Sequence, residues 1–279
     1  MIYKVQKSVE YIKFLLNQKR YSEILGRKTI VFLHIPKVGG SSFWHSLAKT
    51  ASNNCDIGIR DSYAEMVTLV RTNSDDPQNK ALFLIKKTFD ESNKKKLIFH
   101  HHVASGNLIE YFPDAGFIVM VRNPLDRLRS GFRHLMQMAS DKEYDQAKNK
   151  IFTYDFLNRP LDFFESEFCH GINYFIASLF GNHIDPLAPP SLNVIHFIKK
   201  NFYFFTLDDF RLNNYKIKLI EKKLLISSID SFHYEGTITD AKFDKELDFL
   251  LANNKDFSRK WNELLHAKNV WHKALGIDV

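Results

Sequence analysis

The sequence predicts an α/β fold with three layers, in which a central parallel sheet is flanked by helices. Short apolar runs of strand-forming residues alternate along the chain with segments whose apolar residues recur at helical spacing. The chain has 279 residues, of which 44% are hydrophobic, and can therefore bury a sizeable core. No repeat, low-complexity tract or Pro/Gly/Ser-rich stretch divides it, so we expect a single domain over residues 1–279.

Four apolar runs are expected to form the strands of the sheet. Each is short and rich in β-branched or aromatic residues, as buried strands are; they are residues 29–35, 96–102, 116–121 and 202–207. The helical segments between them supply the crossover connections that parallel strands require. Ligands of such sheets bind beyond the carboxyl ends of the strands, so the residues that follow each run are candidates for function.

Segments with apolar residues at helical spacing are expected to form the surrounding helices. They are residues 5–24, 41–51, 64–70, 124–138, 161–180, 209–225 and 257–274, with a short helix or turn at 106–112. Two polar or Pro-rich segments, residues 73–79 and 182–191, are expected to be loops. The chain is thus divided into an N-terminal helix (1–27), a ligand-binding core (28–140) and a helical remainder (141–279).

The charge and the cysteines narrow the class of protein. A net charge of +7 suits an anionic ligand, although a modest excess like this more often reflects ordinary solvation of the surface. Cys55 and Cys169 stand far apart and fit no metal spacing, which favours a reducing compartment and a cytoplasmic location. Residues 1–27 mix polar residues into their apolar ones, so we expect no signal peptide, and no run reaches the length of a membrane span.

The segment HIPKVGGSS, between the first strand and a helix, has the composition of a phosphate cradle. Glycines let the backbone approach an anion closely, and the free N–H groups of the following helix point at it. Lys37 adds a full charge; the backbone and hydroxyl donors come from Gly39, Gly40, Ser41 and Ser42. The lysine precedes the glycines, unlike in a Walker A motif, which disfavours an ordinary kinase or GTPase. The alternative is a plain βα turn with a serine cap.

A second segment, VRNPLDRLRSGF, follows the third predicted strand. Arg122 ends that strand, and Ser130 lies about two turns into the next helix, so both can converge on one phosphate. Arginine suits this role because its planar fork binds oxyanions bidentately. Arg127 and Arg129 add positive potential, unless they form a solvated face on which Asp126 pairs with a neighbouring arginine.

Together the two segments resemble the sulfotransferases that use 3′-phosphoadenosine 5′-phosphosulfate (PAPS). Lys37 through Ser42 look like their 5′-phosphosulfate loop, and Arg122 through Ser130 look like their 3′-phosphate site, in the same chain order. The resemblance implies a P-loop-like fold, a PAPS-binding core over residues 28–140, and adenosine 3′,5′-bisphosphate as product. Residues 141–279 carry no motif of their own, and we expect them to form the helical acceptor side and C-terminal region.

Within that family the segments are most similar to the carbohydrate sulfotransferases, particularly the uronyl 2-O branch. This similarity implies a hydroxyl-bearing acceptor, in the first place a glycan. Those enzymes carry a Gly-His-Val-like segment whose histidine is the base, and here His102 matches that histidine while His101 replaces the glycine. The departure leaves the base open between His101 and His102. In the implied mechanism Lys37 stabilises the leaving group, and no metal is required.

The sequence also places several histidines and one arginine near the two motifs. Within a strand His100 and His102 share one face and His101 points away, but no nearby acidic pair supports a zinc site. We expect His34 to be structural, whereas Arg133 and His134 are candidate acceptor contacts. Two other functions are weighed against sulfuryl transfer: an atypical P-loop phosphotransferase that uses ATP and magnesium, and a non-catalytic polyanion-binding protein. No nucleic-acid-binding motif is present in the sequence.

Overall fold

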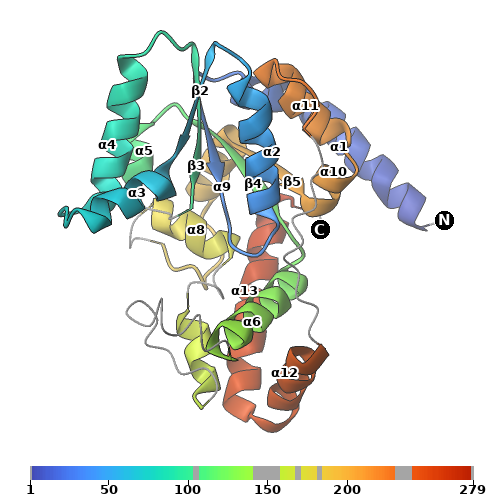
Figure 1. Cartoon of the computed structure of the whole chain (residues 1–279). Helices are drawn as coiled ribbons and strands as arrows, with labels where there is room; N and C mark the ends of the chain where they lie inside the picture. The colour runs from blue at the N-terminus through green and yellow to red at the C-terminus, as the bar shows by residue number, and fades with distance from the viewer. Residues whose placement is uncertain are drawn as a thin grey trace.

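The structure is a computed structural model that describes residues 2–102, 107–140, 158–166, 171–180, 184–229 and 241–277. The described residues form the predicted α/β fold, with helices around a central parallel sheet (Figure 1). Cys169 and Val103 lie outside them. No described helix is long and apolar enough to cross a membrane.

Five strands of the described chain pair side by side, all parallel, in the order β2-β3-β1-β4-β5. They are β1 Thr29–Leu33, β2 Ile57–Asp61, β3 Lys96–His101, β4 Gly116–Val121 and β5 Phe202–Thr206. The four predicted strands are confirmed. Strand β2 escaped prediction because it is an edge strand in which Gly58 and exposed Arg60 interrupt the apolar pattern.

The helices of the described chain are α1 Ile2–Leu25, α2 Gly40–Ser52, α3 Ser62–Arg71, α4 Pro77–Asp90, α5 Asn107–Tyr111, α6 Pro124–Ser140, α8 Ile172–Leu179, α9 Leu192–Asn201, α10 Leu207–Arg211, α11 Tyr215–Leu224, α12 Ala241–Asn253 and α13 Lys255–Leu275, with the 3₁₀ turn η1 Pro160–Glu165. The helices predicted at residues 5–24, 41–51, 64–70, 124–138 and 257–274 are confirmed, as is the short one at 106–112.

Two helical predictions and one loop prediction need correction. The segment 161–180 holds a 3₁₀ turn and then α8, with residues 167–170 between them outside the description. The segment 209–225 breaks into α10 and α11, because Asn213 adopts a positive φ of 42° and Asn214 caps α11 by accepting from the Lys216 N–H. Helix α4 occupies part of the predicted loop 73–79; α9 and α12 escaped prediction.

Helices cover both faces of the sheet. The connection from β1 to β2 through α2 runs in the opposite direction along the sheet from that between β3 and β4 through α5. Right-handed crossovers therefore place α2 and α5 on opposite faces. The ring contacts agree, since Phe43 of α2 lies 5.0 Å from Phe32 of β1, whereas Phe112 beyond α5 lies 4.9 Å from Phe99 of β3.

A second hydrophobic cluster lies beyond the sheet. It is built by α6, η1, α12 and α13, which extend below the sheet in Figure 1. Phe132 of α6, Phe163 of η1 and Phe257 of α13 meet edge to face or tilted, with ring centroids 5.7–6.3 Å apart. Helix α13 also reaches back to the main core, where Trp271 is buried. Helix α13 therefore joins the two clusters.

We expect Leu247→Ala in α12 to lower the free energy of unfolding by about 2–5 kcal/mol, because Leu247 is fully buried in the second cluster. Phe249→Ala in the same helix is the matched control, since Phe249 is 61% exposed, and should change stability by less than about 0.5 kcal/mol. Urea denaturation measures both. Equal losses would contradict the packing of α12 in this cluster.

Candidate active site

The candidate site lies at the carboxyl edge of the sheet, where three strands end together. In the register of the sheet Leu33 of β1 pairs with His101 of β3 and with Val119 of β4. The chain therefore leaves β1, β3 and β4 at one edge, and the segments that carry Lys37, His102 and Arg122 start there. The sequence motifs, far apart along the chain, are brought to the same side of the fold.

The loop after β1 closes tightly onto the start of α2. Lys37 and Gly39 both adopt left-handed backbone conformations, with φ of 66° and 93°. A Cβ on Gly39 would lie 2.7 Å from a methyl of Leu207, and one on Gly40 would lie 2.3 Å from the His34 ring. Neither position has room for a side chain. The glycines thus serve close approach as well as backbone freedom.

Helix α2 starts at Gly40, so the backbone N–H groups of its first turn open toward this loop. Ser41 and Ser42 belong to that turn; Ser41 is exposed and Ser42 half-buried. The first four N–H groups of an α-helix have no acceptor within the helix, and the helix dipole adds positive potential to them. The arrangement is that of an anion cradle.

Four cations gather beside this cradle. Burial lowers the pKa of Lys37, and the positive charges of Arg122, Arg127 and Arg133 lower it further. Burial also lowers the pKa of Arg122; Asp126 opposes this effect, while Arg133 and Arg211 add to it. These groups act on one another only because they lie close together. The structure thus brings Lys37 and Arg122, the charged residues of the two motifs, into one cluster.

Helix α6 holds this cluster in place. The buried Arg127 donates from Nε to the Pro36 carbonyl oxygen at 3.2 Å and ties α6 to the loop. Ser130 lies four residues after Asp126 and three before Arg133, so the three share a helix face. Since Asp126 and Arg133 both act on the pKa of Arg122, Ser130 lies between two residues whose charges reach that guanidinium.

Two arginines of α6 also form ion pairs with α12. Arg133 Nε lies 3.3 Å from Asp244 Oδ1, and Arg129 NH2 lies 3.5 Å from Asp248 Oδ1. The alternative considered for this motif was a solvated basic face on which Asp126 pairs with a neighbouring arginine. Arg129 does form an ion pair, but with Asp248 of α12 instead of Asp126. His134, the other candidate acceptor contact, is half-buried on the same helix.

The histidines at the ends of β1 and β3 form a chain of hydrogen bonds. Asp61 Oδ2 lies 3.1 Å from His100 Nδ1, and His100 Nε2 lies 2.9 Å from His34 Nδ1. Burial would raise the pKa of Asp61, but hydrogen bonds from His100 and from the backbone of α3 outweigh this and lower it. Burial, together with the charges of His102 and His100, holds the pKa of His34 well below its usual range.

His101 and His102 lie in different environments. His102, half-buried just beyond β3, has its ring centroid 4.5 Å from that of His34 and 5.6 Å from that of Tyr63. His101 points to the other face of the sheet and is only 4% exposed, with Nδ1 2.8 Å from the Ser62 hydroxyl. Burial lowers its pKa to about 3. The predicted alternation of the three histidines is confirmed.

Sequence reasoning missed the contribution of β2 to this site. Asp61 ends β2 and caps α3, where its Oδ1 accepts from the backbone N–H groups of Tyr63 and Ala64. An aspartate directly before a helical segment predicts a helix cap. Because β2 was not predicted, the sequence did not indicate that this aspartate lies beside His100. Across the described residues, no group of three or more His, Cys, Asp or Glu side chains is arranged to hold a metal ion.

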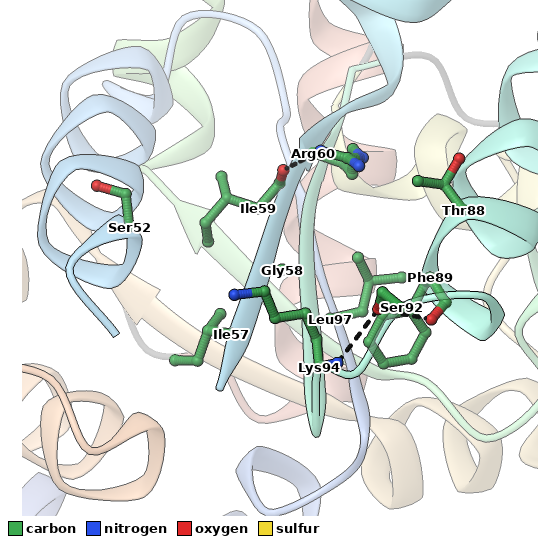
Figure 2. A pocket seen from close by; sticks show the side chains of 10 residues that line it. All are labelled: Ser52, Ile57, Gly58, Ile59, Arg60, Thr88, Phe89, Ser92, Lys94 and Leu97. Atoms are coloured by element: carbon green, nitrogen blue, oxygen red, sulfur yellow. Dashed lines mark hydrogen bonds between the residues drawn. The ribbon is translucent and has the colours of Figure 1, made fainter. Parts of the chain in front are cut away.

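A hollow of about 230 Å³ lies elsewhere on the sheet (Figure 2). It is lined by Ile57 and Leu97, at the amino ends of β2 and β3, and by Phe89 of α4. Arg60 at its rim donates back to the carbonyl oxygen of Ile59. None of the residues that line it belongs to the two motifs or to the histidines at the ends of β1 and β3, so this hollow is separate from the candidate site.

Comparison with known proteins identifies the family. The model of the Sulfotransferase family matches residues 23–169, which is more than half of the chain. The chain therefore belongs to the Sulfotransferase family. The solved structure of a sulfotransferase from Alicyclobacillus acidocaldarius is similar to it at 14% identity and a TM-score of 0.46, over 91% of this chain and 97% of that one. No curated protein matches the chain.

The buried histidines predict a stability that falls as the pH drops below about 6.5. The unfolded chain binds protons there, whereas folded His101 stays neutral down to about pH 3 and His272 down to about pH 4, so acid favours unfolding. Each group contributes up to about 1.4 kcal/mol per pH unit. Urea denaturation between pH 7 and 5 should show a shallower dependence for His101→Gln.

His266→Gln is the matched control for this prediction, because His266 is exposed. It should retain the slope of the wild type. Identical slopes for the wild type and for both variants would contradict the burial of His101 as an uncharged group.

Proposed function

We propose that the protein transfers a sulfuryl group from PAPS to a hydroxyl group of an acceptor, in the first place a carbohydrate, and releases adenosine 3′,5′-bisphosphate. One observation carries the proposal: in a chain of the Sulfotransferase family, Lys37 of the glycine-rich loop and Arg122 of the second motif belong to one cationic cluster. A donor with phosphate at both ends of its ribose needs two such anchors at one edge of the sheet.

The loop fits the 5′-phosphosulfate end of this donor. The positive φ of Gly39 lets the loop turn tightly into α2, and the first turn of that helix offers N–H and hydroxyl donors to an oxyanion. In this proposal the group is held by Gly39, Gly40, Ser41 and Ser42. Lys37 lies in the same loop and stabilises the negative charge that develops on the leaving phosphate.

The second motif fits the 3′-phosphate. Arg122 and Ser130 hold it, with Arg133 beside Ser130 on the same helix face. Burial lowers the pKa of both Lys37 and Arg122, and the positive charge of Arg122 lowers that of Lys37 further. A phosphate between them relieves this repulsion, since an anion favours the charged form of each neighbour. The 3′-phosphate is what distinguishes PAPS from AMP or ATP, so Arg122 determines donor selectivity here.

His102 is the better of the two candidate bases. A general base must reach the acceptor hydroxyl and have a pKa near the working pH. His101 is buried on the other face of the sheet, beside Ser62, and its pKa of about 3 makes it a weak base. His102 is partly exposed at the same edge as Lys37. We therefore propose that His102 accepts the proton of the acceptor hydroxyl.

The remaining work of the protein is positioning. By analogy with phosphoryl transfer, sulfuryl transfer runs in line through a loose transition state, so catalysis depends on alignment and charge stabilisation. Residues 28–140 supply these groups. Residues 141–279 shape the acceptor side in this proposal, together with Arg133 and His134; the carbohydrate rests on the resemblance of the two motifs. A cytoplasmic location stays a prediction.

Donor selectivity tests the assignment of Arg122. In thermal-shift titrations the wild type should bind adenosine 3′,5′-bisphosphate more tightly than AMP or ATP, without magnesium. Arg122→Ala should weaken the bisphosphate about 10- to 100-fold, the loss expected for a charged hydrogen bond, and leave AMP nearly unchanged.

Arg259→Ala, which removes an exposed arginine of α13, is the control for Arg122→Ala and should bind like the wild type. Equal losses for AMP and the bisphosphate in Arg122→Ala would refute a 3′-phosphate site. A magnesium-dependent preference for ATP would favour the phosphotransferase instead.

Incubation with ³⁵S-labelled PAPS and a panel of polysaccharides tests the reaction itself. We expect label in a hydroxyl-bearing glycan, and a loss of about 10²–10⁴-fold in rate for His102→Gln, as for other general bases. The paired variant His101→Gln should keep the larger part of the activity. A reversed order of the two variants would assign the base to His101, and an unlabelled panel would refute the carbohydrate acceptor.

A further inference from the structure

The hydrogen-bonded chain of Asp61, His100 and His34 ends on the glycine-rich loop. Asp61 contacts His100, and His100 contacts His34, at 3.1 and 2.9 Å. The opposite edge of the His34 ring, with Cδ2 and Nε2, packs against Gly40, where an added Cβ would lie 2.3 and 2.7 Å from these two atoms. A carboxylate in β2 is thus linked to the first residue of α2.

The direction of these hydrogen bonds follows from the carboxylate. Asp61 Oδ1 accepts from the N–H groups of Tyr63 and Ala64, at 3.0 and 3.2 Å, so the side chain is ionised and its Oδ2 also accepts. His100 therefore carries a proton on Nδ1. If Nε2 of His100 carries a lone pair, it accepts a hydrogen bond from His34 Nδ1–H. Nε2 of His34 then carries a lone pair and no proton.

The far end of the chain favours this direction. His34 Nε2 lies at the start of α2, where backbone N–H groups without a helical acceptor create positive potential. A lone pair suits that position, whereas an N–H group there would add another donor. The pKa of His34, held well below its usual range by burial and by His102 and His100, agrees with an uncharged ring.

We propose that Asp61 fixes the proton on Nδ1 of both His100 and His34, and that His34, as an uncharged ring, is a positioning residue between the base His102 and the loop at Gly40. The catalytic part of this inference rests on the proposed function of His102. The charged and titratable groups around His34 are His102, His100, Asp61 and His45.

A neutral His34 has a direct consequence for the reaction. Its ring centroid lies 4.5 Å from that of His102, the group that becomes positively charged when it accepts a proton. A second imidazolium at this distance would oppose that charge. The same ring fills the space beside Gly40, so one side chain sets the place of both the base and the loop.

Asp61→Asn tests the proposal, because it should reverse the whole chain. Asparagine caps helices as well as aspartate does, and its Oδ1 can keep the bonds to Tyr63 and Ala64. Its amide N–H₂ then faces His100, which must accept on Nδ1 and carry its proton on Nε2. His34 must in turn accept on Nδ1 and present an N–H to Gly40.

Nitrogen-15 NMR of the full chain with labelled histidine reads these protons directly. The signals of the two rings are assigned with His34→Gln and His100→Gln, each of which removes one pair. The wild type should show protonated Nδ1 and bare Nε2 in both rings, and Asp61→Asn should show the reverse. A doubly protonated His100 in the wild type at neutral pH, or unchanged tautomers in Asp61→Asn, would overturn the proposal.

Kinetics test the positioning role separately. Asp61→Asn should lower kcat with PAPS by about tenfold or more, part of the 10²–10⁴-fold that a base contributes. Asp76→Asn changes the cap of α4, where Asp76 accepts from the Asn79 N–H, and is the matched control; it should match the wild type in kcat and tautomers. An unchanged kcat in Asp61→Asn would refute the positioning role. A wild type inactive with PAPS would refute the proposed function instead. The tautomers would then still test whether Asp61 fixes the protons on Nδ1 of His100 and His34.

Discussion

The pairing of β1 with both β3 and β4 is the constraint on which the site depends. Leu33 is held in register with His101 on one side and with Val119 on the other, so three segments with different chemistry leave the sheet at one edge. The glycine-rich loop, the histidines and the arginine motif lie far apart along the chain, and the sheet register is what gathers them. All three strands are buried on both faces, so the ladder hydrogen bonds and the helices packed on either side hold this register.

The central strands and both motifs could be predicted because each apolar run ends directly at residues that carry chemistry. The edge strand could not, since Gly58 and Arg60 break its pattern and its pairing with β3 is a long-range property. Because this strand was not predicted, the contact between Asp61 and His100 was not predicted either. The break at Asn213 and the separation of η1 from α8 were likewise decided by local caps and tertiary packing, which override helical spacing.

The two faces of the sheet divide the histidines by chemistry. Alternation along β3 sends His101 into an apolar layer with Ser62 as its hydrogen-bond partner, while His100 faces α2, packs against both Phe32 and Trp44, and contacts His34. Neighbouring residues of one type therefore acquire different basicity and different partners from strand geometry alone. The ambiguity between His101 and His102 in the sequence is thus a question of which face each side chain occupies.

Helix α6 runs without interruption for 17 residues from the arginine motif into the second hydrophobic cluster. A helix of this length spans about 25 Å and behaves as a stiff rod. If the packing of α12 and α13 tilts the C-terminal half of α6, Ser130 and Arg133 must therefore move relative to the glycine-rich loop, to which Arg127 is hydrogen-bonded. Through this rigid helix, a packing change in the second hydrophobic cluster alters the positions of site residues at the carboxyl edge of the sheet.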